Sequence, residues 1–500
     1  MADWGFYGRA QALDELSRIV NGGRWFFCRI EGRRRIGKTS LLSQLAKQDS
    51  RLSDHLIYMQ VPDSDERDVA TAFQRSLLDC DHALAKRLAP AVINFPTMAR
   101  AIGELCRAGL VLVLDEFQYF TRAALYSFNS FLQAEVDKLR DANLKQGGLF
   151  ILGSLQADMN ALLDDSGAPL YGRITQRIKL QHWDFEELQQ LFRAQSVEEP
   201  SQWLTLWTFF EGVPKFYHDA YEQGLFDEGP ENFGDALLTK MFVRSSSPLS
   251  EEADTWFLRE LRGRSISVLT FLADHAGCSN GELLAGVGAP EEKTQIGAYL
   301  SKLVNAYGMI DKLNPVFADS KSRNARYYIA DNFLQAWLAV AKPAREAFRL
   351  KPLAKVLESA KPRLEGLEGF AFEKLIRRLH AECSQKGKGD FELSTLQMGY
   401  WNRSKDVNRS IEIDLVALDE PNKRIRFGSC KRAASAHDNA SLAGFQKHVD
   451  GFLAAKEHMH LKDWRKELVV FSPVFTAGDR SHFAGKGFGA KDLRDYAALF

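Results

Sequence analysis

The sequence predicts an α/β fold for the N-terminal part of the chain, and three observations lead to this prediction. A glycine-rich loop at 32–39 lies between an apolar run at 25–30 and an amphipathic segment at 40–46, in the order strand, loop and helix. A second apolar run, at 110–114, ends in two acidic residues. Segments of strand length also alternate with helical patterns up to residue 183. The further strand candidates are 55–60, 148–152 and 178–180, and a helical stretch covers roughly 65–108.

The loop at 32–39 fits the phosphate-binding pattern G-x-x-x-x-G-K-[ST]. Its glycines let the backbone curl, so that successive N–H groups and the N-terminus of the next helix face a phosphate chain. Lys38 would reach the terminal phosphates and Thr39 a magnesium ion, so we expect ATP and Mg²⁺ as ligands. The nucleotide-binding residues expected here are Gly32, Arg33, Arg34, Arg35, Ile36, Gly37, Lys38, Thr39 and Ser40.

The acids that follow the run at 110–114 are Asp115 and Glu116. Four apolar residues followed by two acids are typical of a strand that carries one carboxylate to a magnesium ion and places the next beside the attacking water. We therefore expect Asp115 to bind nucleotide-bound Mg²⁺ together with Thr39. Glu116 is the catalytic candidate that polarises the water.

Two later residues are candidates for contact with the transferred phosphate. Ser154 follows the strand at 148–152, where a polar residue can sense the terminal phosphate; a simple turn serine is the alternative. Arg173 is the candidate for an arginine that neutralises charge on the phosphoryl group, and a surface arginine is the alternative.

The composition limits the classes of partner. The chain has 500 residues, 45% of them hydrophobic, and its 65 lysines and arginines balance 65 aspartates and glutamates. No global positive charge draws it to nucleic acid or to a membrane surface. Six widely spaced cysteines without a C-x-x-C pair favour reduced thiols, and the longest apolar runs are too short to span a bilayer. We expect a cytoplasmic protein with no membrane partner.

Residues 250–340 have the pattern of a winged helix-turn-helix. Helical segments at 265–276, 280–285 and 291–306 precede strands near 308–310 and 326–329, which form a two-stranded hairpin. Such a module can place its third helix in the major groove of DNA. That helix carries Lys293 and Lys302 balanced by two glutamates, so phosphate contact depends on the wing residues Lys321, Arg323 and Arg326. DNA binding and a role in structure or protein docking both remain open here.

The last part of the chain carries a second group of chemically useful residues. A helix expected at 366–381 contains Glu373, and a strand at 411–417 carries Glu412 and Asp414 on one face. The next strand, 424–431, ends in Lys431. Carboxylates that hold a divalent ion, with a lysine that orients the nucleophile, are the set used in metal-dependent phosphodiester cleavage. Glu373, Asp414 and Lys431 are the catalytic candidates, with Asp414 and Glu412 as metal ligands; solvated strand charges are the alternative.

Taken together, these motifs resemble those of the archaeal-type P-loop ATPases, a branch of the AAA+/STAND group. The resemblance rests on Phe6-Tyr7-Gly8-Arg9, the loop at 32–39, residues 114–118, Gly153-Ser154, Tyr171-Gly172-Arg173 and Gly212-Val213-Pro214. It implies ATP binding and hydrolysis at the residues named above. The C-terminal part resembles restriction-endonuclease-like domains of the PD-(D/E)XK pattern, which falls on Asp414 and Lys431 with Glu373 on the first helix.

The resemblance predicts an ATPase core of the P-loop NTPase type, a helical lid, a winged helix, a connector and a restriction-endonuclease-like domain. Their expected boundaries are 1–183, 184–249, 250–340, 341–364 and 365–500.

One position departs from the nuclease pattern, which has Glu or Gln two residues before the lysine where this chain has Ser429. Two hypotheses follow. In the first, the ATPase is a switch that controls a DNA-binding or DNA-cleaving C-terminal domain. In the second, it is a signalling or assembly ATPase that acts on protein partners and carries an inactive nuclease-like domain. Under either hypothesis, the backbone N–H groups of the arginines at 33–35 should face phosphate, and their side chains should point outward, toward the lid or a neighbouring subunit of a homo-oligomer.

Overall fold

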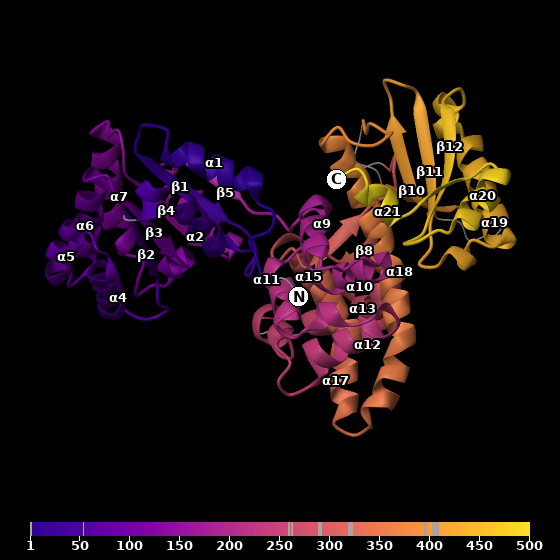
Figure 1. Cartoon of the computed structure of the whole chain (residues 1–500), viewed down its shortest axis with the longest axis horizontal. Helices are drawn as coiled ribbons and strands as arrows, with labels where there is room; N and C mark the ends of the chain where they lie inside the picture. Colours follow the sequence, from indigo (N-terminus) through magenta and orange to yellow (C-terminus); the bar gives the residue numbers. More distant parts are fainter. Residues whose placement is uncertain are drawn as a thin grey trace. The chain divides into compact units, whose positions relative to one another are not determined.

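The computed structural model describes residues 3–53, 55–258, 261, 264–288, 293–318, 324–394, 398–402 and 410–500. The chain forms two compact units (Figure 1). The first comprises Phe6–Trp183 with Val213–Lys215, and the second comprises Met1–Gly5, Asp184–Gly212 and Phe216–Phe500. The division into five domains remains a prediction. Lys321 and Arg323, expected in the wing, lie outside the described residues.

The first unit is built on a five-stranded sheet in the order β2-β3-β4-β1-β5. All neighbouring strands are parallel. Because parallel strands share one carboxyl edge, the loop after β1 and the acids at the end of β3 emerge on the same side. The five expected strands are confirmed: β1 (Phe26–Glu31), β2 (Leu56–Gln60), β3 (Val111–Asp115), β4 (Gly148–Gly153) and β5 (Gln176–Lys179).

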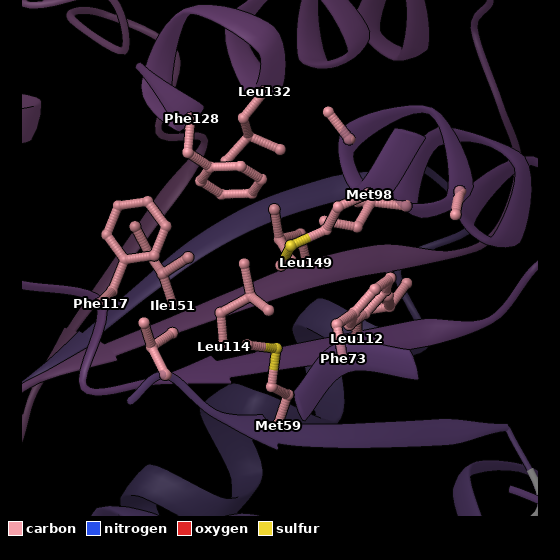
Figure 2. Packing of buried hydrophobic residues seen from close by; sticks show 14 of the residues in the cluster. Met59, Phe73, Met98, Leu112, Leu114, Phe117, Phe128, Leu132, Leu149 and Ile151 are labelled. Atoms are coloured by element: carbon pink, nitrogen blue, oxygen red, sulfur yellow. The ribbon is translucent and has the colours of Figure 1, made fainter. Parts of the chain in front are cut away.

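Helices cover both faces of this sheet, because its central strands are apolar on both sides. Figure 2 shows one face, where β2, β3 and β4 pack against α4 (Glu66–Asp79), α6 (Phe95–Arg107) and α7 (Phe128–Asp141). On the other face, α1 (Ala10–Val20) and α2 (Lys38–Gln48) contribute buried leucines. The helical stretch expected at 65–108 is divided. It contains α4, α5 (Ala83–Leu88) and α6, the last beginning at a capping box formed by Asn94 and Thr97.

The second unit begins with the helices expected for the lid. Asp184 and Glu187 form a capping box that starts α9 (Phe185–Ala194). Next come α10 (Pro200–Phe210), α11 (Pro214–Glu222) and α12 (Phe233–Leu238). Nearly every residue of α10 is buried, which makes this helix the centre of its bundle.

Residues 265–329 show the element order expected of a winged helix. The helices are α13 (Ser265–Asp274), α14 (Asn280–Val287) and α15 (Lys293–Asn305). The strands are β6 (Cys278–Ser279), β7 (Ile310–Leu313) and β8 (Arg326–Ile329), in the order β6-β8-β7. The sequence predicts two strands, and this was incomplete. The extended residues before α14 add a third strand, because Cys278 pairs with Tyr327 of β8.

The C-terminal part is organised around a long helix and a mixed sheet (Figure 1). Helix α18 runs from Leu353 to Gln385, with Pro362 inside it. The sequence predicts a start near 366, and this was wrong, since α18 begins inside the expected connector and covers its second half. The sheet order is β13-β12-β11-β10-β9, antiparallel from β9 to β11 and parallel from β11 to β13. Its strands are β9 (Met398–Trp401), β10 (Glu412–Asp419), β11 (Arg424–Cys430), β12 (Arg465–Phe471) and β13 (Gly489–Lys491).

All six cysteines are free thiols. Among the described residues, none of the helices combines the length and the apolar character that a bilayer span requires.

Candidate functional site

The backbone of the loop at 32–39 depends on its glycines. Gly37 has φ 90° and caps α2 in the left-handed conformation. Gly32 has φ 154°, and a Cβ there would lie 2.8 Å from the Leu180 carbonyl oxygen. The local sequence therefore folds as a curled loop that leads directly into the N-terminus of α2, where backbone N–H groups favour an anion.

Arg9 braces this loop from outside the motif. Its guanidinium donates to the carbonyl of Ile36 at 3.1 Å and to that of Gln181 at 2.7 Å, and the side chain is buried. The loop is thus tied to the chain after β5. The sequence contained the signal for this contact, because Arg9 ends the Phe6-Tyr7-Gly8-Arg9 motif.

Lys38 lies in the concave part of the loop. Its ammonium donates to the carbonyls of Gly32 at 2.9 Å and Arg33 at 3.2 Å. Burial lowers the pKa of Lys38, while the carboxylates of Asp115 and Glu116 act in the opposite direction. The lysine is therefore positioned by its own loop and close to the acids at the end of β3.

Asp115 is held by two hydroxyl groups. Its Oδ2 accepts from Thr39 Oγ1 at 2.9 Å and from the Tyr58 hydroxyl at 2.8 Å. Burial, and next the Asp115 carboxylate, raise the pKa of Tyr58. The expected pair of Thr39 and Asp115 is brought together by the fold. Tyr58, on β2, was not identified from the sequence, because an alternating strand gives no sign of which side chain reaches its neighbour.

Glu116 belongs to a second polar group. Its carboxylate accepts from Ser154 Oγ at 3.2 Å and from the Gln118 amide. Gln118 is buried and also accepts from the backbone N–H of Ser154 at 3.4 Å. The Arg34 guanidinium lies 3.8 Å from Glu116. The structure thus places Ser154 beside the candidate catalytic glutamate, with Gln118 as a further residue of the site.

Arg173 lies in a different environment. It forms a two-point ion pair with Asp137 of α7, at 2.8 and 2.9 Å, and also donates to the Tyr171 carbonyl. Within the described part of the chain, these hydrogen bonds go to α7 and to its own loop, and not to Lys38, Thr39 or Glu116. Its role in phosphoryl transfer stays a prediction.

Two family profiles match the sequence. Residues 6–216 match an ATPase domain found predominantly in Archaea, the segment that contains every element of the nucleotide site described above. The N-terminal unit is an archaeal-type P-loop ATPase domain. Residues 337–442 match a family of archaeal and bacterial proteins of unknown function.

One relative and two solved structures show how far the similarity extends. An uncharacterized protein of Methanocaldococcus jannaschii is 26% identical over 431 residues, 85% of this chain and 87% of the relative. A Walker-type ATPase of Pyrococcus abyssi gives a TM-score of 0.47 at 17% identity and covers 67% of this chain and 96% of its own. The ORC2 protein of Aeropyrum pernix, in ADPNP–ADP complexes, gives 0.47 at 14% identity and covers 73% and 96%.

Beyond the ATPase domain, the C-terminal acids meet on one face of the mixed sheet. Glu373 of α18 lies within electrostatic range of Asp414 on β10 and of Lys431, which follows β11. Asp414 Oδ2 accepts from the backbone N–H of Cys430 at 2.8 Å, and Glu373 accepts from Arg377 at 3.1 Å. Burial, followed by the charge of Asp414, raises the pKa of Glu373 to about 8. Burial also raises the pKa of Asp414.

Glu412 lies on the same face but has another partner. Its carboxylate accepts from Arg326 of β8 at 2.6 Å. Glu373 and Asp414 fit a magnesium site, because Mg²⁺ is commonly held by one or two carboxylates together with substrate phosphates. Ser429 is buried on β11 and has a hydroxyl where the nuclease pattern has an acid. The metal-ligand role expected of Glu412 stays a prediction.

A further group of metal-ligating side chains was not anticipated. His218, Asp219 and Glu222 of α11 bring three ligand atoms within 4.8 Å of one another. Within the described part of the chain, this is the one group of three that meets this distance.

Proposed function

We propose that the chain is an ATP-driven switch in which the nucleotide state of the ATPase domain controls a DNA-cleaving C-terminal domain. The observation that supports this coupling is the position of Glu211. It lies two residues before Val213–Lys215, which belong to the ATPase unit, and its side chain contacts helix α18, which carries Glu373.

In the ATPase domain, each residue has a defined task. The loop N–H groups and Lys38 would bind the phosphates, and Thr39 and Asp115 would hold Mg²⁺, which would supply positive charge to the phosphates when bound. Glu116 orients the water and accepts its proton. Ser154 and Gln118 fix the Glu116 carboxylate, so the direction of that proton transfer depends on their hydrogen bonds.

The chain leaves the second unit at Gly212, and residues Val213–Lys215 belong to the ATPase unit. A Cβ on Gly37 of the phosphate loop would lie 3.9 Å from Pro214. The residue before this crossing, Glu211, has φ 52° and ψ −102°, a strained conformation for a residue other than glycine. A shift of the phosphate loop would therefore act first on a bent, strained connection.

The carboxylate of Glu211 reaches helix α18. It is buried and lies 3.4 Å from Lys374 and 3.6 Å from Arg378. Its second oxygen accepts from the backbone N–H of Asn332, whose side chain accepts from Lys374 at 2.8 Å. Lys374 is the neighbour of Glu373 in the sequence. A buried charge shared by these groups is costly to displace, so movement at Glu211 would be passed to α18.

At the C-terminal site, Asp414 would hold a divalent ion with Glu373, and the ion would activate water when bound. Lys431 would orient that water and stabilise the phosphate. DNA is the substrate class that this set of residues favours, with a phosphodiester as the bond that is cleaved.

The test uses the full-length protein with plasmid DNA, Mg²⁺ or Mn²⁺, and ATP. We expect cutting that disappears in Asp414→Ala and Lys431→Ala, while both variants still hydrolyse ATP. Glu211→Gln should keep ATP hydrolysis and lose the dependence of cutting on ATP. Glu231→Gln, at an exposed position in the same region, serves as the matched control.

A second function, signalling or assembly without DNA cleavage, is favoured by one observation, the serine at position 429. Without a carboxylate at this position the site carries less negative charge, which is typical of a nuclease-like domain kept for binding. In that case the ATPase acts in signalling or assembly on protein partners, with the half-buried arginines of the phosphate loop turned toward a second copy of the chain. Absence of both cutting and salt-sensitive DNA binding would favour this function.

A further inference from the structure

Arg326 of the wing hairpin, which we define as β7, β8 and the described residues between them, contacts the C-terminal domain. Its guanidinium donates to Glu412 Oε1 at 2.6 Å and stacks over the ring of Trp401 at 4.7 Å. Glu412 and Trp401 are directly opposite each other on β10 and β9. Arg326 is therefore bound by a cross-strand pair, in a geometry that combines a charged hydrogen bond with a cation–π contact.

Three further contacts join the hairpin to the same domain. The backbone N–H of Val316 donates to the Gly399 carbonyl at 3.0 Å, and the Trp401 indole N–H donates to the Asn324 carbonyl at 2.6 Å. The ring of Phe317 lies 5.4 Å from that of His458. The hairpin thus packs on β9 through residues on both of its arms.

The next residue on the same face of β8 is Tyr328, two positions after Arg326. Burial raises the pKa of Tyr328, and the charges of Arg326, Arg377 and Glu373 also act on it. This face of β8 therefore borders the C-terminal site, and Arg326 is engaged there. In the sequence, Arg326 is one of three wing residues on which phosphate contact by this module would depend, and DNA binding was left open.

We infer that Arg326 is a positioning residue of the C-terminal site, which holds Glu412 away from the metal and so leaves the site with two carboxylate ligands. The inference rests on the proposed metal-dependent function of that site. Glu412 and Asp414 lie on one face of β10, and the charge of Glu412 reaches both Asp414 and Glu373. Released from Arg326, Glu412 could supply the third carboxylate that Ser429 does not.

The chemical consequence is a change in affinity for a divalent ion. Each added carboxylate ligand raises the affinity of an oxygen site for such an ion. While the wing hairpin is docked, the site should bind the ion weakly and depend on the phosphate of DNA to complete its ligands. When Arg326 leaves, the same site should bind the ion without DNA.

The experiment measures Mn²⁺ binding by electron paramagnetic resonance of the free ion, using nucleotide-free, full-length protein. Every sample carries Asp115→Asn, so that the nucleotide site is not counted. We expect Arg326→Gln to tighten the C-terminal Kd by roughly tenfold, the effect of about one added carboxylate ligand. Arg326→Gln with Glu412→Gln should return to the starting Kd. Arg345→Gln, which removes an ion pair to Glu251 in the same unit, is the matched control and should change nothing.

Glu412→Gln alone leaves Arg326 in place and keeps the test decisive if Arg326→Gln fails to fold. It should leave the Kd unchanged, whereas Asp414→Asn should abolish the site. The inference is overturned if Glu412→Gln weakens binding as much as Asp414→Asn, or if a folded Arg326→Gln binds Mn²⁺ no more tightly. Mn²⁺ binding with these responses but without plasmid cutting would refute the proposed nuclease and leave the role of Arg326 intact.

Discussion

The nucleotide site and the C-terminal site both bring acids together at the ends of strands, but they hold these acids in different ways. Asp115 and Glu116 are hydrogen-bonded mainly by neutral groups, namely the hydroxyls of Thr39, Tyr58 and Ser154 and the amide of Gln118. Glu373 and Asp414 are half-buried, and loss of water around them, together with the neighbouring acidic charges, raises the pKa of both.

The difference concerns what must happen before a cation binds. Neutral donors fix a carboxylate without cancelling its charge, so the nucleotide site is prepared for a cation. At the C-terminal site, burial favours the protonated acid, and a metal ion must displace a proton. The nucleotide site is therefore organised before a cation binds, whereas cation binding at the C-terminal site requires that a proton leaves.

Glu116→Gln should have the largest effect on the first site. The amide keeps the shape of the side chain but cannot accept a proton, so hydrolysis should fall by roughly 10²–10⁴-fold. ATP binding should persist. Measurement of turnover and of nucleotide affinity on the same sample checks both parts, and normal turnover would remove Glu116 from the mechanism.

Lys38→Ala should abolish detectable ATP binding at micromolar nucleotide. Loss of a charged donor to the phosphates costs about 1.5–3 kcal/mol, or roughly 10–100-fold in Kd, before any change in the loop is counted. Lys47→Ala, at the exposed end of the same helix, is the control. Binding of a fluorescent ATP analogue gives the result, and equal affinity in the two variants would contradict the assignment.

The affinity of the C-terminal site for a divalent ion should depend on pH. The pKa of Glu373 is raised from 4.5 to about 8, so Mn²⁺ affinity should increase with pH up to about 8, because less proton must be displaced. Glu373→Gln should flatten this pH profile.

The raised pKa of Glu373 also determines how the stability of the fold changes with pH. The folded state holds the Glu373 proton more tightly than the unfolded state. The contribution of this residue to the free energy of unfolding is therefore full below about pH 4.5 and is lost as the pH rises to about 8. Glu373→Gln should therefore gain stability relative to the unmodified chain at pH 8 and not at pH 4. Thermal unfolding at the two pH values measures the difference.

Tyr58→Phe should have the smallest effect and would show how far hydroxyl groups prepare the first site. It removes the 2.8 Å hydrogen bond to Asp115 and leaves the ring in place. We expect a loss of about three- to tenfold in apparent Mg²⁺ affinity during ATP hydrolysis, with ATP affinity in the absence of Mg²⁺ unchanged. Tyr171→Phe, at an exposed position, is the control. An equal change with and without Mg²⁺ would show that Tyr58 only supports the fold.

Much of the ATPase domain was predictable, because its signals are local. The loop at 32–39 needs glycines at fixed spacing, and Asp115, Glu116 and Ser154 each follow a strand directly. Parallel strands then deliver these residues to one edge of the sheet. The meeting of Glu373, Asp414 and Lys431 was also predictable, from strand alternation and element order.

Only the tertiary structure decided which partners these residues have. Tyr58 reaches Asp115 across neighbouring strands, Arg326 pairs with Glu412 across 86 positions, and Glu211 contacts α18 from the end of α10. Such pairs depend on how separate elements pack, and no spacing along the chain encodes them. The sequence by itself determined where the chemistry lies. Packing decided that one acidic site is held by hydroxyls and the other by burial and a distant arginine.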